Sequence, residues 1–93
     1  MILDLSLANH RLYAGLEIER LAGKATLLTP PGQAIPVVAS NLAAMVIDPE
    51  EVVLTGAMAI WAYLAVFHLL HGKTRRIYYQ DGRGERLLVA AHG

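Results

Sequence analysis

The sequence has 93 residues, a formal net charge of zero and no cysteine. These values exclude disulfide bonds and thiol chemistry, and they give no global charge signal for a nucleic-acid or membrane partner. Apolar residues make up 55% of the chain and charged residues only 17%, which is apolar for a single small domain over residues 1–93. We therefore expect part of the apolar surface to be buried against a second copy, as in a homodimer.

The charged residues are unevenly distributed along the chain. Residues 71–93 hold five basic residues against two acidic ones, whereas residues 1–70 hold three basic residues against six acidic ones. A basic end on a neutral body favours a small anionic ligand over double-stranded DNA. A solvated strand followed by a basic turn explains the same pattern equally well.

The start of the chain predicts a β-hairpin. Residues 2–7 alternate between apolar and polar side chains, and residues 12–19 do so again after a turn at residues 8–10. The first run contains Asp4 and has no basic residues before it, so it is not a signal peptide, and we expect a cytoplasmic protein.

The middle of the chain leaves two alternatives open. Residues 30–32, Pro-Pro-Gly, predict a sharp turn, and Pro36 breaks any helix that begins before it. After that point, either a short helix over residues 41–47 or a strand over residues 35–39 fits the sequence.

The second half of the chain predicts a crossover unit. Residues 52–54 are apolar on both faces, as in a central strand that is covered on both sides. Thr55-Gly56 then leads into a helix over residues 58–70, which has no polar face and should contact the sheet on one side and a partner on the other. A strand, a turn and a last strand follow at residues 74–80, 81–84 and 86–91. The order predicts an α/β fold of minimal Rossmann-like type, with an N-terminal hairpin, a β-α-β crossover and a C-terminal β-hairpin.

The same stretch also permits a membrane alternative. Residues 52–70 contain no Asp, Glu, Lys or Arg, which meets the length of a spanning helix. Gly56 splits the stretch, however, and leaves a helix of roughly fifteen residues, which is too short to span a bilayer. We therefore expect no membrane segment.

Histidines near the end of this helix are the first candidates for chemistry. His68 and His71 lie in its last turn, where the helix dipole favours an imidazolium that could donate a proton to a leaving oxygen. Two helix-end histidines that bond the last free carbonyls explain the pattern as well. With Asp81 as a third ligand they would make only a weak metal site.

The Asp-Gly-Arg-Gly turn at residues 81–84 is the second candidate. Its glycines allow close approach of a ligand, Arg83 can bind a phosphate, and Asp81 can orient a hydroxyl or a base. An ordinary hairpin turn is the alternative. No partner is evident for His10 or His92.

Taken together, these motifs resemble a known family. The order VVLTG–x3–IW, a helix ending LLHGKT, a strand ending YQDGRG and a closing LLVAAH is similar to the small CRISPR-associated ring nucleases of type III systems, the minimal CARF-like proteins. The resemblance covers residues 51–92 and implies a CARF-like dimer that pairs with a second dimer around its ligand. It also implies an enzyme of antiviral defence, a phosphodiesterase that cleaves the second messenger cyclic tetra-adenylate to linear oligoadenylates and so switches off ancillary effectors.

Carried over residue by residue, the resemblance implies that His71, Asp81 and Arg83 are catalytic. His71 and Asp81 are also the candidate ligands of a divalent ion, with Mn²⁺ the ion expected if the reaction uses one. The family's Arg and Pro near the helix start are replaced here by Ala57 and Ala59, so a non-catalytic binding module of the same fold is the alternative. Contacts to the cyclic oligoadenylate or a short RNA are expected from Thr55, Gly56, Met58, Trp61, Lys73 and Arg75.

Overall fold

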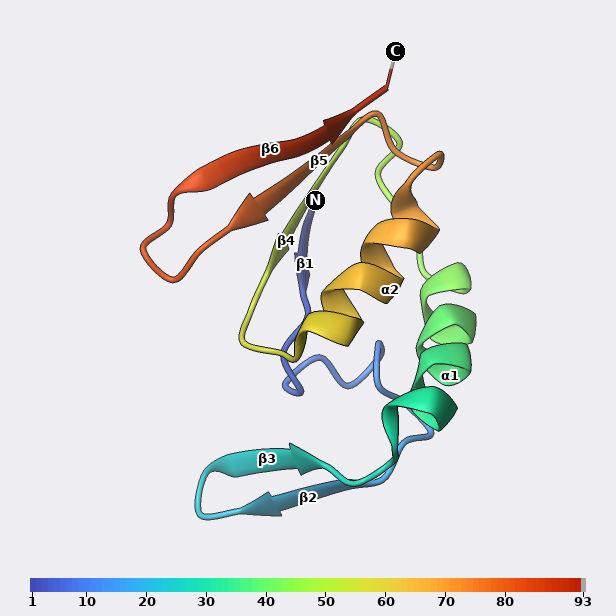
Figure 1. The fold of residues 1–93 in the computed structure, drawn as a ribbon, viewed down its shortest axis with the longest axis vertical. Helices are drawn as coiled ribbons and strands as arrows, with labels where there is room; N and C mark the ends of the chain where they lie inside the picture. The colour runs from blue at the N-terminus through green and yellow to red at the C-terminus, as the bar shows by residue number, and fades with distance from the viewer. Residues whose placement is uncertain (93) are drawn as a thin grey trace.

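The computed structural model describes residues 1–92 and shows an α/β fold in which two helices pack on a mixed four-stranded sheet. The order of strands in this sheet is β1-β4-β5-β6 (Figure 1). Strands β1 (Ile2–Asp4) and β5 (Arg76–Gln80) both pair in parallel with β4 (Glu51–Thr55). Strand β6 (Arg86–Ala91) pairs antiparallel with β5 and forms one edge.

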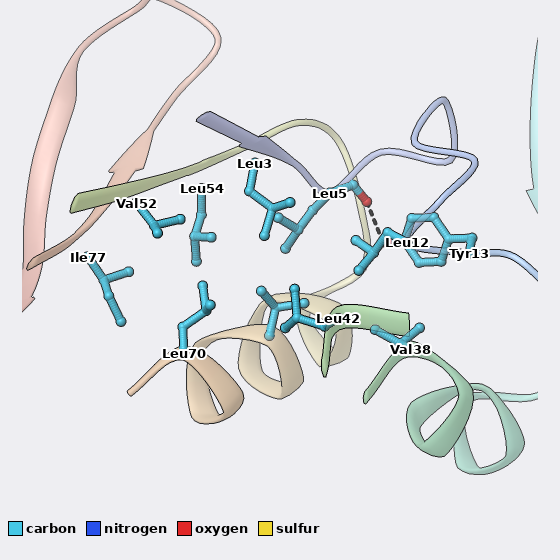
Figure 2. Packing of buried hydrophobic residues seen from close by; sticks show 11 residues of the cluster. Leu3, Leu5, Leu12, Tyr13, Val38, Leu42, Val52, Leu54, Leu70 and Ile77 are labelled. Carbon is cyan, nitrogen blue, oxygen red and sulfur yellow. Dashed lines mark hydrogen bonds between the residues drawn. The ribbon is translucent and has the colours of Figure 1, made fainter. Parts of the chain in front are cut away.

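Both helices lie on the same face of this sheet, as Figure 2 shows for the buried side chains between them. Helix α2 (Ile60–Leu70) connects β4 to β5, and helix α1 (Pro31–Ala43) precedes β4 and packs beside α2. The core is therefore a single layer between sheet and helices. It includes Leu3, Val52, Leu54 and Ile77 from the sheet, Val38 and Leu42 from α1, and Val66 and Leu70 from α2.

The crossover β4-α2-β5 and the C-terminal hairpin β5-β6 confirm the sequence prediction for the second half of the chain. The prediction that the central strand is covered on both sides is wrong. Within residues 1–92 no helix covers the second face, where Ile2, Val53, Tyr78 and Leu88 form one register line across the four strands. Val53 is nevertheless fully buried on that face, between its neighbouring strands.

The predicted N-terminal hairpin is also wrong, because β1 pairs with β4 rather than with the segment that follows it. Residues 6–17 form turns instead of a strand, and the side chain of Asn41 on α1 fastens them by donating to the carbonyls of Leu12 and Ala14, at 2.9 Å each. Leu12 is buried, as the alternation indicated, but Tyr13, which the alternation placed on the polar side, is also buried, and Ala14 on the apolar side is exposed.

A hairpin does occur, but later in the chain. Strands β2 (Ile18–Leu21) and β3 (Lys24–Leu27) form a separate two-stranded sheet that projects from the body (Figure 1). Its two-residue turn, Ala22-Gly23, has positive φ angles of 51° and 75°, which is the geometry that matches the twist of paired strands.

Helix α1 runs through Pro36, so both alternatives for the middle of the chain were wrong. Pro31 occupies a position at the start of the helix where no backbone donor is needed. Pro36 removes only one bond, whose acceptor would be the carbonyl of Gly32 in the first turn. Burial of Ala34, Val38 and Leu42, spaced four residues apart, outweighs that loss.

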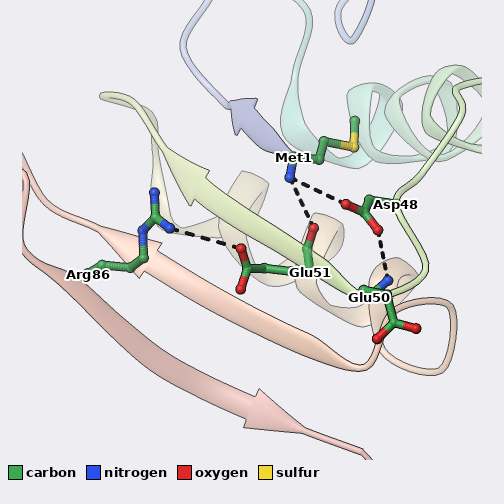
Figure 3. Close-up of polar contacts among 5 residues, drawn as sticks. All are labelled: Met1, Asp48, Glu50, Glu51 and Arg86. Carbon is green, nitrogen blue, oxygen red and sulfur yellow. Dashed lines mark hydrogen bonds and ion pairs between the residues drawn. The ribbon is translucent and has the colours of Figure 1, made fainter.

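Polar contacts fasten the amino end of β4 (Figure 3). The Met1 amino group donates to the Glu51 carbonyl at 3.2 Å and lies 3.7 Å from the Asp48 carboxylate. A backbone hydrogen bond from Glu50, more than the nearby amino group, lowers the pKa of Asp48. Arg86 reaches across the face without helices to Glu51, with 4.0 Å between the charged atoms.

Candidate active site

The carboxyl ends of the three parallel strands meet at one edge of the sheet. The chain leaves β4 at Thr55-Gly56 and leaves β5 at Gln80, and the Thr55 hydroxyl donates to the Gln80 carbonyl at 3.0 Å. A hollow of about 300 Å³ lies here, lined by Thr55, Gly56, Ala57, Tyr79, Gln80 and Gly82. Thr55 and Gly56 thus line a hollow at the position where ligands bind in open α/β sheets.

Gly56 holds this edge together by a close backbone approach. Its φ is +102°, and a Cβ atom at this position would collide with the Asp4 carboxylate and lie 2.9 Å from the Ser6 nitrogen. Only glycine satisfies both demands without strain. The fold itself therefore requires this glycine, whether or not a ligand contacts it.

Asp4 is a residue of this edge that sequence reasoning missed, because it was interpreted only as the polar side of a strand. Its carboxylate accepts from the Ser6 backbone at 2.8 Å and from the Ser6 hydroxyl at 3.0 Å. Burial, then the neighbouring Tyr79, then Asp4 raise the pKa of Tyr63, whose hydroxyl donates to the Gly56 carbonyl. An acidic residue at the end of a parallel strand was the available signal.

A second hollow of about 380 Å³ adjoins the start of α2 and the β2-β3 hairpin, and it is lined in part by Met58, Ala57 and Arg20. Arg20 donates to the Leu7 carbonyl at 2.9 Å, so its guanidinium is already oriented towards the body. Trp61 lies half-buried in the first turn of α2. Of the predicted ligand contacts, Met58 and Trp61 are thus near the same edge as Thr55.

Asp81 and Arg83 lie in the β5-β6 turn beyond the end of β5. Asp81 Oδ1 accepts the backbone N–H groups of Arg83 and Glu85, at 2.8 and 3.1 Å. These bonds brace the turn and engage one carboxylate oxygen. The Arg83 guanidinium is exposed and forms no ion pair within residues 1–92.

His71 lies at the opposite end of the sheet, paired with His92. The two Nε2 atoms are 2.8 Å apart and the ring centroids 4.2 Å apart, so one imidazole donates and the other accepts a single proton. His71 ends α2, and the His92 backbone donates to the Arg75 carbonyl at 2.6 Å. Sequence reasoning had found no partner for His92, although the predicted hairpin places the end of the last strand beside the start of β5, five residues after His71.

Basic residues surround this histidine pair in the chain. Lys73 is exposed, and Arg75 lies 3.6 Å from the Glu50 carboxylate in an exposed ion pair. The predicted contacts Lys73 and Arg75 therefore accompany His71 and not the hollow at Thr55. His68, on the preceding turn of α2, is exposed and takes no part in the pair.

One chain does not bring the three predicted catalytic residues together. The extended chain from Arg75, beside His92, to Asp81 spans roughly 20 Å. His71 lies at one end of β5, and Asp81 and Arg83 lie at the other. The proposed metal pair of His71 and Asp81 is likewise not formed within a chain, and residues 1–92 contain no group of three acidic or histidine side chains suited to a metal ion.

Comparisons with protein-family models, curated proteins and solved structures found no match to this chain. None of the helices within residues 1–92 is long and apolar enough to cross a membrane.

Proposed function

We propose that the chain is a ring nuclease that cleaves cyclic tetra-adenylate, built on a minimal CARF-like domain. The observation that supports this most directly is the His71–His92 pair, with its nitrogens 2.8 Å apart beside Lys73 and Arg75. An imidazole pair that shares one proton is equipped both to accept and to donate a proton, and adjacent cations favour a phosphate.

The substrate supplies its own nucleophile, so the residues required are few. The 2′-hydroxyl loses its proton to a base as its oxygen attacks phosphorus, the P–O5′ bond breaks, and the 5′-oxygen receives a proton from an acid. Products are a 2′,3′-cyclic phosphate and a 5′-hydroxyl. We assign the proton transfers to His71 with His92, and the binding of the phosphate to Arg83. We assign the positioning of Arg83 in its turn to Asp81, which accepts the Arg83 backbone N–H.

The separation of the two ends implies that the complete site forms between copies. For His71 and Asp81 to act on one phosphate, the histidine end of one copy must meet the Asp-Gly-Arg-Gly turn of another. A symmetric pair would hold two such sites, which suits a ring with repeated linkages. The donor set of one chain does not fit Mn²⁺, so we assign no step to the ion.

A non-catalytic binding module is the second candidate, and one observation favours it. Asp81 Oδ1 is engaged by two backbone N–H groups, which is the role of an aspartate in an ordinary turn. A protein with this turn could bind the ring through the hollow at Thr55 and through Arg83 without cleaving it.

A single-turnover assay tests the proposal. Protein in excess is mixed with labelled cyclic tetra-adenylate, with and without Mn²⁺, and the products are separated. We expect linear products, and a loss of about 10²–10⁴-fold in rate for His71→Ala, as for removal of a general acid or base. His68→Ala, a change to an exposed histidine on the same helix, should leave the rate unchanged.

Mixing variants tests whether the site is shared. His71→Ala and Asp81→Ala, each inactive alone, should together recover about a quarter of the wild-type activity, because half of the pairs are mixed and each mixed pair keeps one intact site. Tight binding of an intact ring by the wild type would favour the binding module. Neither binding nor cleavage would reject both candidates.

A further inference from the structure

An apolar surface lies between α2 and the outer strand of the sheet. On α2 the residues Ile60, Tyr63, Leu64 and Phe67 are spaced three and four apart and form one stripe. Together with Leu54, Tyr79 and Val89, the last three of this stripe line a groove of about 300 Å³ whose walls are almost wholly apolar. We call six of these and neighbouring residues the apolar surface: Ile60, Leu64, Phe67, Tyr79, Leu87 and Val89.

The apolar surface is open to solvent in the single chain. Ile60 is 77% exposed and Leu64 is 65% exposed, and on β6 both Leu87 and Val89 are about half exposed. Helix α2 carries no Asp, Glu, Lys or Arg at all. Such a helix is normally buried all round, yet here only the side with Ala62, Val66 and Leu70 is buried.

We propose that the apolar surface is an interface with a second copy of this chain, in which the two α2 helices pack antiparallel. The surface is self-complementary, because the ridge of Ile60 and Leu64 lies directly beside the groove. A two-fold axis therefore places the ridge of each copy in the groove of the other. The absence of charged side chains on α2 means that identical copies meet without repulsion.

The available area also fits a second copy. The exposed area of these six side chains is on the order of 500 Å² per copy, which is more than half of the ~800 Å² per partner that a standard interface buries. Helices that pack in this way lie about 8–10 Å apart.

The antiparallel arrangement has a consequence for the candidate site. The carboxyl end of α2, with His71, would lie beside the amino end of the partner's α2, which is the end of the sheet that holds Thr55, Gly56 and the turn with Asp81. The two separated halves would thus be brought to the same place. This consequence rests on the proposed function, whereas the interface itself does not.

The mass of the protein in solution, measured by sedimentation in the absence of any ligand, tests the interface. We expect twice the chain mass of 10.1 kDa. Leu64→Glu, at a position already exposed, should raise the dissociation constant at least tenfold while the chain stays folded. Val46→Glu is the matched control, since Val46 is 90% exposed and lies outside the apolar surface.

A cross-link gives a second measurement that does not depend on the strength of association. The sequence has no cysteine, so Leu64→Cys introduces a single thiol near the middle of α2, close to the two-fold axis. Oxidation should link two copies for Leu64→Cys and not for Val46→Cys.

Three results would overturn the interface: a wild type that stays monomeric at 50 µM or more, an assembly that Leu64→Glu leaves unchanged, or a monomer that binds neutral lipid vesicles through Leu64. A dimer lost in Leu64→Glu supports it whether or not the ring is cleaved. If that dimer forms and no ring is cleaved, only the nuclease proposal fails.

Discussion

Gly56 shows how a single residue can fix the edge of the sheet where the candidate site lies. A side chain there would meet the Asp4 carboxylate and the Ser6 backbone, and the positive φ of +102° adds strain. We expect Gly56→Ala to lower the free energy of unfolding by about 2–4 kcal/mol, the sum of an unfavourable backbone conformation and a forced backbone shift. Urea unfolding followed by circular dichroism measures this change.

Gly82→Ala is the control for that experiment. Gly82 lies in the β5-β6 turn, where an added Cβ would contact nothing within 4 Å. Its stability should change by less than about 0.5 kcal/mol. Equal effects of the two substitutions would contradict the idea that the close approach at Gly56 matters.

Tyr13 provides a test that depends on pH. Its hydroxyl is buried and donates to the Leu5 carbonyl, as the dashed line in Figure 2 marks, and burial, followed by the charge of Asp4 and by Tyr63, raises its pKa. The folded state therefore keeps a proton that the unfolded state loses above about pH 10. The contribution of Tyr13 to the free energy of unfolding is therefore fully present below about pH 10 and decreases as the pH rises further.

Tyr13→Phe should lower the free energy of unfolding by about 1–3 kcal/mol at neutral pH, because the Leu5 carbonyl loses its donor. It should also weaken the decline of stability above pH 10. Urea titrations at several pH values measure both effects, with Tyr78→Phe as the comparison at neutral pH. If the stability of Tyr13→Phe declines above pH 10 as steeply as that of the wild type, groups other than Tyr13 cause the decline.

At the scale of the elements, prediction from the sequence succeeded where local pattern and pairing coincide. The β4-α2-β5 unit and the β5-β6 hairpin join neighbours in the chain, so Gly56 and the Asp81–Gly84 turn marked their limits. Strand β1 could not be placed in this way, because its partner β4 lies some fifty residues away. The alternation of apolar and polar residues indicates a strand but not the strand with which it pairs. The prediction for the segment of helix α1 was wrong for another reason, since burial of one helix face outweighed the penalty of Pro36.

The β2-β3 hairpin is an element whose contribution to stability can be isolated. It contains no buried residue, and its base is closed by a hydrogen bond of 2.8 Å from the Leu28 nitrogen to the Glu17 carbonyl. Replacing residues 19–26 by a short Gly-rich turn should therefore cost less than about 1 kcal/mol, because an isolated two-stranded hairpin is marginal by itself. Thermal unfolding measures this cost.

Val38→Ala serves as the reference for that deletion. Val38 is fully buried on α1, and its truncation should cost about 1–3 kcal/mol through lost burial and an unfilled space. If the shortened protein loses more stability than Val38→Ala, the hairpin supports the core in a way that burial does not show.

At the scale of the whole molecule, the high apolar content appears as large apolar side chains that the single chain leaves exposed on α2 and β6. Ile60 and Leu64, which local reasoning placed on a helix buried on two sides, are more than half exposed in the single chain. The α/β class was predictable, because helical and strand periods alternate along residues 52–91. The division of His71 and Asp81 between two ends also follows from the predicted strand over residues 74–80, which lies between them, whereas the motif by itself groups both residues in one site.

The pairing of β1 with β4 also sets an order of events during synthesis. The first strand is made long before its partner, and Met1 bonds to Glu51, which lies fifty positions further along the chain. Sheet pairing at such a separation in sequence is slow, because a long loop must close before any contact forms. Until Thr55 and Gly56 have left the ribosome, Leu3 and Leu5 have no sheet to join, so this apolar segment stays unpaired while about fifty further residues are made.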